Sequence, residues 1–206
     1  IVLPIRNSKP IIDFRFRSNP SVDDIGGDTS FTFPTRTFVW DVQDQDGVET
    51  ITDIYYTLDD TCSTCWEQLS AAAYSSLTLT ELEPGNHTFY VKARDIAGAE
   101  SDIIQFPDHN NPSEPHYWKV LPVQGEVLLI DDFVQDSQNN AQQWYRSVLD
   151  TALGNSNYSV WEIGRELPYS NTDLSATLNY FNHVIWNSSY TGSETYLDAS
   201  SNIYNF

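Results

Sequence analysis

Hydrophobic and polar positions alternate through the first half of the chain. Residues 87–94 (HTFYVKAR) place an apolar side chain at every second position, as a strand with one buried face does. Turn-forming residues separate the alternating segments, among them the stretches DVQDQDG, EPGN and DIAGA. Strands are predicted at residues 11–17, 37–42, 54–58, 65–69, 76–82, 87–94 and 102–106. Short strands separated by turns in this way are typical of a β-sandwich.

The pattern changes after residue 125. Residues 126–132 (EVLLIDD) form a continuous apolar run that ends in two aspartates, which is typical of a buried parallel strand. Residues 138–153 predict a helix whose apolar face carries Ala141, Trp144 or Tyr145, Val148, Leu149 and Ala152. Two more strands (158–163 and 183–186) and two more helices (173–181 and 193–206) are predicted. This alternation predicts parallel βαβ units with right-handed crossovers.

The segment between the two halves, residues 108–125, has the composition of a linker. It contains three prolines and several polar residues, and its Tyr117-Trp118 and Val120-Leu121 pairs predict that it docks against a domain. The predicted organisation is therefore a lead-in at 1–9, a β-sandwich at 10–107, this linker, and an incomplete α/β domain at 126–206. The fold class is a multidomain β plus α/β chain.

Specific runs of residues resemble known repeats. The run LTLTELEPGNHTFYVKARDIAGAES resembles the E–F–G region of bacterial fibronectin type III or Ig-like repeats, and WDVQDQDG, YYTLDD and Trp66 fit the earlier part of such repeats. This resemblance covers residues 10–107. It implies a fold and says little about function, because the sandwich carries many unrelated functions.

The second half resembles a flavodoxin-like domain related in fold to class I glutamine amidotransferases. The matching pieces are VLLIDD, YSVWEI and FNHVIWNSS. The family pattern would continue with a helix, a Gly-Gly and a strand beyond Phe206. Since three parallel strands are few for a domain, we expect the rest of the same polypeptide or a neighbouring subunit to complete the sheet.

The charge and the apolar runs exclude some partners. The formal net charge is -19, with 10 basic and 29 acidic residues, so the surface disfavours nucleic acid. No apolar run reaches the roughly 18 residues that a membrane helix needs, so membrane insertion is not expected. The chain has no methionine, not even at its start, which indicates a piece of a larger protein. An acidic surface suits an extracellular or cell-surface location.

The two cysteines, Cys62 and Cys65, form a CSTC motif. The favoured interpretation is a local disulfide that pins a loop, followed by free thiols and then by redox catalysis. A structural zinc site would need four ligands, and there is no second CxxC motif.

Two groups of carboxylates are candidates for binding. Asp41, Asp44, Asp46 and Asp95 lie in two turns that a sandwich can bring to one end, where they could bind Ca²⁺; the alternative is solvated turns in which each aspartate bonds its own backbone. Asp131, Asp132 and Asp136 follow the first parallel strand, at the edge where open α/β sheets bind ligands. The alternative for this second group is that it caps the following helix.

The chain contains no complete catalytic motif. No cysteine follows Cys65, and there is no GxSxG, HExxH or glycine-rich phosphate loop. The sequence therefore predicts a non-catalytic interaction or structural module of a larger secreted or cell-surface bacterial protein. One alternative is a fragment of a secreted hydrolase or amidotransferase-like enzyme completed downstream. Another is a carbohydrate-binding module that uses exposed aromatic side chains, for which the candidates are Trp66, Trp118 and Trp186.

Overall fold

The computed structural model describes residues 7–15, 29–71, 75–107, 116–132, 141–162 and 171–188. These residues form two compact units, and the chain passes between them more than once. Unit 1 takes its described residues from Ile1–Ser30, Thr37–Thr78 and Gly85–Lys119. Unit 2 takes them from Phe31–Arg36, Leu79–Pro84 and Val120–Phe206.

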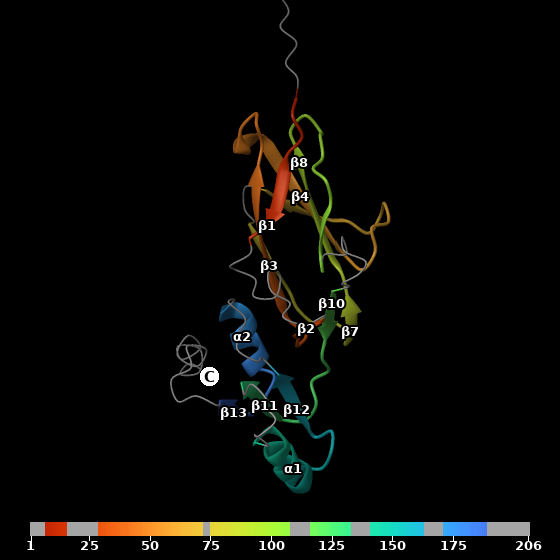
Figure 1. Cartoon of the computed structure of the whole chain (residues 1–206). Coiled ribbons are helices and arrows are strands. Elements are labelled where there is room, and N and C mark those ends of the chain that lie inside the picture. The colour runs from red at the N-terminus through yellow and green to blue at the C-terminus, as the bar shows by residue number, and fades with distance from the viewer. Residues whose placement is uncertain are drawn as a thin grey trace, which may run out of the picture. The chain divides into compact units, whose positions relative to one another are not determined.

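The described chain is mostly β-strand, with few helices (Figure 1). Its elements are, in chain order, β1 (Ile11–Phe14), β2 (Thr29–Thr32), β3 (Arg36–Gln43), the short 3₁₀ turn η2 (Val48–Thr50), β4 (Ile51–Leu58), β5 (Glu67–Ser70), β6 (Ser76–Leu79), β7 (Gly85–His87), β8 (Phe89–Asp95), β9 (Ile104–Phe106), β10 (Tyr117–Val120), β11 (Val127–Asp132), α1 (Ala141–Leu153), β12 (Tyr158–Glu162), α2 (Asn171–Leu178) and β13 (His183–Ser188).

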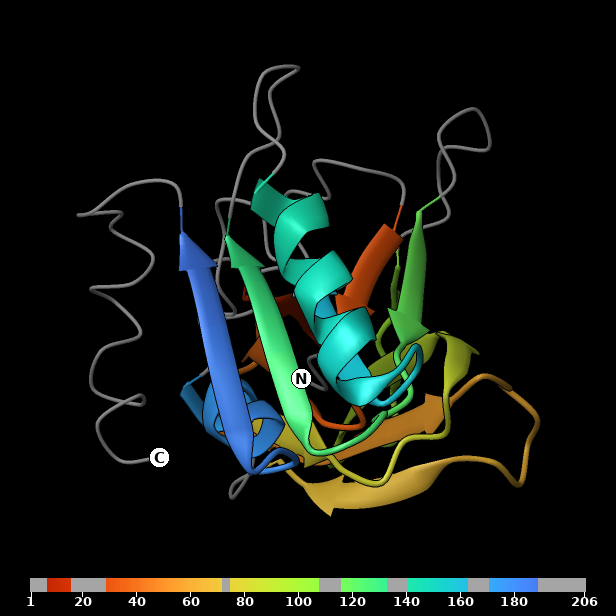
Figure 2. The same cartoon turned by 90° about the horizontal axis from the view of Figure 1, so that it is seen from below.

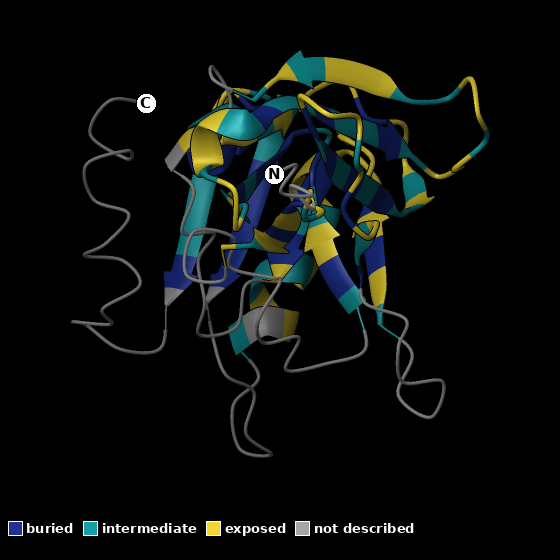
Figure 3. Ribbon diagram, turned by 90° about the horizontal axis from the view of Figure 1, so that it is seen from above, coloured by how far each residue is buried: buried dark blue, intermediate teal, exposed yellow. Residues whose placement is uncertain are grey.

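Two antiparallel sheets form the core of unit 1. One has the order β1-β3-β6 and the other β5-β4-β8-β9. The predicted alternation is present in β8, where Phe89, Val91 and Ala93 are fully buried and the residues between them are half-buried. Figure 3 shows such alternation as bands of different burial colour along the strands. The rings of Phe38 in β3 and Phe89 in β8 stack at a centroid distance of 4.0 Å. The two sheets therefore share one aromatic core, consistent with a fibronectin- or Ig-like sandwich.

A third sheet, of order β2-β10-β7, corrects part of the sequence analysis. Strand β10 lies inside the segment that composition assigned to a linker. Trp118 and Val120 are fully buried whereas Tyr117 is 43% exposed, which is the alternation of a strand with one buried face. The surrounding prolines and polar residues hid this strand because it spans only four residues. The predicted strand at 87–94 is also divided, between β7 and β8.

Unit 2 contains a parallel sheet of order β12-β11-β13. Side chains of β11 alternate between its faces: Leu128 and Ile130 pack with α2, and Leu129 packs with α1. Each helix therefore covers one face of the sheet, as Figure 2 shows for α1 (green-cyan) and α2 (blue). This arrangement follows from the right-handed crossovers that join parallel strands on either side of a central strand.

The buried face of α1 carries only part of the predicted set. Tyr145 and Leu149, four residues apart, contact the sheet. Trp144 is 60% exposed and Val148 is 44% exposed, so both lie on the outer side of the helix. The sequence pattern admitted either register because apolar residues occupy adjacent positions at 144–145 and 148–149.

Residues 31–36, predicted to lie within the sandwich domain, belong to unit 2. The ring of Phe33 meets Trp161 and Phe181 edge to face, at centroid distances of 5.9 and 5.3 Å. The hydroxyls of Thr35 and Tyr180 share a hydrogen bond of 2.7 Å. The compact units thus follow other boundaries than those predicted at residues 107 and 126. The helix predicted at 193–206 lies outside the described residues.

Candidate functional site

Polar side chains line up where the three parallel strands of unit 2 end. The strand registers place Asp131 of β11 beside Glu162 of β12 and beside Asn187 of β13. Strand order reverses between β11 and β13, and open α/β sheets bind ligands at the carboxyl ends of their strands at such a reversal. We call Asp131, Glu162 and Asn187 the strand-end row.

The strand-end row faces α1. Val127, Leu129, Val160 and Ile185 contact the α1 side of the sheet, and side chains at every second strand position share a face. Asp131, Glu162 and Asn187 continue that spacing. Arg146 of α1 donates a hydrogen bond from its guanidinium to the carboxylate of Glu162, as this orientation requires.

Two members of the row, Asp131 and Asn187, are deeply buried, whereas Glu162 is exposed. Asp131 is 2% exposed and Asn187 is 7% exposed. Neither Nδ2 of Asn187 nor Nε of Arg146 has a hydrogen-bond partner within the described part of the chain. A buried donor without a partner costs about 1–3 kcal/mol, so folded proteins rarely retain one without a reason.

Sequence reasoning found only part of this row. Asp131 was predicted, but Glu162, Asn187 and Arg146 were not. Asp132 ends β11 beside Ser188, and Asp136 lies outside the described residues, so the predicted three-carboxylate pocket stays a prediction. One signal could have revealed Asn187: it is a polar residue directly after the apolar strand HVIW, the same position that Asp131 holds after VLLI.

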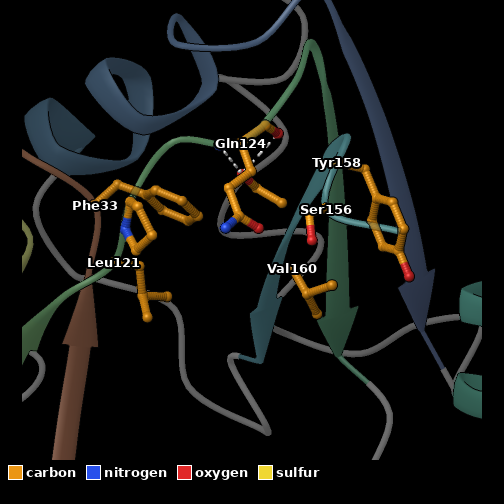
Figure 4. A pocket seen from close by; sticks show the side chains of 8 residues that line it. Phe33, Leu121, Gln124, Ser156, Tyr158 and Val160 are labelled. Carbon is orange, nitrogen blue, oxygen red and sulfur yellow. Dashed lines mark hydrogen bonds between the residues drawn. The ribbon is translucent and has the colours of Figure 1, made fainter. Parts of the chain in front are cut away.

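A shallow pocket of about 280 Å³ lies on strand β12 of unit 2 (Figure 4). Its lining consists of Phe33, Leu121, Pro122, Gln124, Ser156, Tyr158, Ser159 and Val160. Ser159 already serves the fold, because its hydroxyl accepts the amide N–H of Gln124 at 2.8 Å and donates to the carbonyl of Gln124 at 3.1 Å. The Tyr158 hydroxyl donates to Asp150 at 2.9 Å. The first pair closes the loop onto β12, and the second joins β12 to α1, so these polar groups indicate no particular ligand.

The four aspartates predicted to bind calcium have separate hydrogen-bond partners in unit 1. Asp41 forms an ion pair with Arg15, and hydrogen bonding to this guanidinium lowers the pKa of Asp41. Asp44 Oδ1 accepts the amide N–H of Asp46 at 2.8 Å, which is a local turn contact. Asp46 accepts the amide N–H of Ser8 at 2.8 Å.

Asp95 stabilises the turn that follows β8. Its carboxylate accepts the side-chain amide of Asn7 at 2.7 Å and the backbone N–H of Ala99 at 2.8 Å. The hydrogen bond from Asn7, helped by backbone N–H groups of the turn, lowers the pKa of Asp95. Gly98 has φ 89°, a conformation that favours glycine, which explains the Asp-x-x-Gly spacing. The calcium site therefore stays a prediction, and the described contacts give Asp41 and Asp95 structural roles.

Cys62 and Cys65 form a disulfide in the loop between β4 and β5. The element that follows is a strand, so the motif is not at the start of a helix as it is in thioredoxin-like redox sites. In the described residues, one group of three potential metal ligands lies within 4.8 Å, namely Asp60, Cys62 and Cys65. The disulfide occupies both sulfurs of that group, and Asp60 accepts the amide N–H of Cys62 at 3.0 Å.

The tryptophans considered for carbohydrate binding occupy three different environments. Trp118 is fully buried in the core of unit 1, and Trp186 packs, partly buried, against the α2 side of the parallel sheet. Trp66 is half-buried, and the ammonium of Lys92 lies 4.8 Å from its ring centroid. Of the three, Trp118 is too enclosed to meet a sugar.

None of the described helices combines the length and apolar character needed to cross a membrane.

No protein-family model matches the chain, and no curated protein matches it. Among solved structures, the fibronectin(III)-like modules of CbhA from Clostridium thermocellum match over 54% of this chain and 46% of that one, with 16% identity and a TM-score of 0.35. The extracellular domain of a hybrid two-component system from B. thetaiotaomicron matches with 16% identity and a TM-score of 0.35, over 57% of this chain and 16% of that one. A fibronectin type III domain of a human protein matches with 14% identity and a TM-score of 0.30, over 54% of this chain and 97% of that one. The chain thus spans less than half the length of the first two, and all three likenesses are distant.

Proposed function

We propose that the chain is a non-catalytic interaction or structural module of a larger secreted or cell-surface bacterial protein. The observation that carries this proposal is the Cys62–Cys65 disulfide in a loop of unit 1. Structural disulfides persist in oxidising compartments and are rare in the bacterial cytoplasm. The position of the disulfide between two strands supports a role in holding the loop rather than in thiol chemistry.

The polar contacts of unit 1 support the same proposal. Asn7 and Ser8 bond the turns at Asp95 and Asp46, and Lys9 forms an ion pair with Asp102 at 2.6 Å. These groups tie loops of unit 1 together. A net charge of -19 suits a surface exposed to the medium.

The proposal is tested by the oxidation state and location of the protein in its source cells. Cells are quenched with acid, and their thiols are alkylated with a maleimide polymer before and after reduction. We expect the two cysteines to react only after reduction, and the protein to be digested when intact cells are treated with protease. Free thiols, together with resistance to protease until the cells are lysed, would refute an extracellular module.

A second candidate function is a fragment of an enzyme whose α/β domain is completed by further chain. The strand order β12-β11-β13, with a helix on each face, favours this candidate and is the basis for proposing a flavodoxin-like domain. An activity survey of the full-length protein against esters, amides and glycosides tests it. Activity lost on deleting residues 126–206 would favour the enzyme over the module.

A further inference from the structure

We propose that the strand-end row and Arg146 bind a polyhydroxylated ligand, such as a sugar or a polyol, on the α1 side of the parallel sheet. The site consists of Asp131, Asn187 and Arg146, with Glu162 holding Arg146 in place. It lies within unit 2 and uses described residues only. It does not depend on the function proposed above, because the site can bind whether the protein is secreted or not.

Asp131 and Asn187 place a carboxylate beside a carboxamide. Asp131 and Asn187 are register partners on neighbouring strands, which lie about 4.8 Å apart in a sheet. Their side chains leave the same face, since both continue the spacing of residues that contact α1. Two planar polar groups at this separation can bond adjacent hydroxyls of one small molecule.

Two N–H donors at the site are unsatisfied within the described residues. Nδ2 of Asn187 and Nε of Arg146 are both buried and lack a hydrogen-bond partner within the described residues. The side chain of Asn187 as a whole is 7% exposed, so bulk water does not solvate it freely. A ligand with acceptor oxygens would bond these donors and so remove the free-energy cost of leaving them unsatisfied.

The charges at the site select the chemical class of the ligand. An anion would accept from both donors, but it would lie against the carboxylates of Asp131 and Glu162. A divalent cation would suit the carboxylates, but metal ions bind oxygen atoms and leave N–H donors unsatisfied. A hydroxyl group can accept from Asn187 or Arg146 while donating to Asp131. A ligand that has several hydroxyls satisfies both kinds of group.

The experiment is a titration of the full ¹⁵N-labelled chain, followed by NMR. D-glucose, D-mannose and myo-inositol are the probes, and calcium chloride and sodium phosphate are titrated separately to represent the other two chemistries. We expect a saturable shift of the Asn187 side-chain amide and of the Asp131 backbone amide with at least one polyol. Calcium and phosphate should leave these signals unchanged.

Three variants locate the binding. Asn187→Val removes the donor from the strand-end row, and we expect affinity to fall about tenfold, as for one lost hydrogen bond. Arg146→Lys keeps the positive charge for Glu162 but lacks the Nε–H group, and we expect a similar loss. Asn182→Val is the matched control, because Asn182 is exposed and precedes the opposite end of β13. Its affinity should equal that of the unaltered chain.

Several results would overturn the proposal. They are the absence of saturation with all three polyols, a response to calcium or phosphate alone, and equal polyol binding by the unaltered chain and both site variants. The amide spectrum of each variant shows whether it is folded. Should Asn187→Val not fold, Arg146→Lys alone decides the outcome, because its half-exposed side chain tolerates replacement.

Discussion

The buried charges of Arg36 and Asp173 provide a quantitative test of how unit 2 is held together. Arg36 is 2% exposed and Asp173 is 7% exposed. Burial lowers the pKa of Arg36 to about 10, and the nearby carboxylate of Asp173 opposes this fall. Asp173 also lies in the first turn of α2, where a negative charge is favourable. The substitution Asp173→Asn removes this charge with little change in shape.

The expected loss follows from the burial of the remaining cation. A fall of the Arg36 pKa to about 10 corresponds to a net cost of roughly 3 kcal/mol for the charged form, with the favourable contribution of Asp173 already included. Removing one partner of a buried charge pair typically costs about 3–5 kcal/mol, because the other charge stays buried. We therefore expect Asp173→Asn to lower the free energy of unfolding of unit 2 by about 3 kcal/mol.

Hydrogen exchange measures this loss in unit 2 alone. Amides of Leu128 and Ile130 lie in the central strand β11 and report opening of the parallel sheet. A loss of about 3 kcal/mol would speed their exchange roughly 100-fold. Glu126→Gln serves as the control, because Glu126 is exposed and its charge should matter by less than about 0.5 kcal/mol.

The double variant Arg36→Met with Asp173→Leu completes the test. Replacing both charges by apolar groups removes the desolvation cost together with the attraction, so stability should return close to that of the unaltered chain. If Asp173→Asn exchanges no faster than the control, the two charges do not stabilise unit 2. If the double variant is less stable than Asp173→Asn, the pairing argument is wrong, since the losses would then come from packing.

Three further predictions concern single sites. Asn187→Val should raise the free energy of unfolding by about 1 kcal/mol in urea titrations, because it removes a buried donor that lacks a partner. A fall of about 1 kcal/mol in the free energy of unfolding would contradict the absence of a partner for this donor. Asp95→Asn should make stability fall less steeply with pH below about pH 4. The pKa of Asp95 is lowered in the fold, so its carboxylate stabilises the folded state above the unfolded pKa. This contribution is lost as pH falls through the folded pKa, and the asparagine variant lacks it. Cys62→Ser with Cys65→Ser should lower stability by about 2 kcal/mol, the loop-closure entropy of so short a loop, measured by calorimetry against the oxidised protein.

Local periodicity predicted the elements that depend on local sequence. The alternation in HTFYVKAR corresponds to β8, and the apolar run VLLIDD corresponds to β11. Strand β10 was missed because four residues among prolines give too short a pattern for period-two alternation to stand out. The α1 face was ambiguous for a similar reason, since Trp144 and Tyr145 are both apolar and only packing distinguishes them.

The candidate site depended on information that no local pattern contains. Asp131 could be predicted because it directly follows an apolar strand. Its neighbours Glu162 and Asn187 come from strands that are 31 and 56 residues away along the chain, and only the parallel registers bring them together. Arg146 joins the row because α1 crosses one face of the sheet, which is again a property of the tertiary fold.

Residues 31–36 have a consequence for how this protein can be divided. Phe33 supplies a ring to the core formed with Trp161 and Phe181. The charge of Arg36 interacts with that of Asp173. An expression fragment that starts at the sequence-based boundary near residue 126 would lack both side chains, and it would expose the apolar surface that Phe33 covers. Recombination at that boundary would produce the same defect, so the α/β unit cannot be exchanged between proteins as a continuous cassette. A fragment for separate study should retain residues 31–36, for instance by circular permutation or by co-expression of the two pieces.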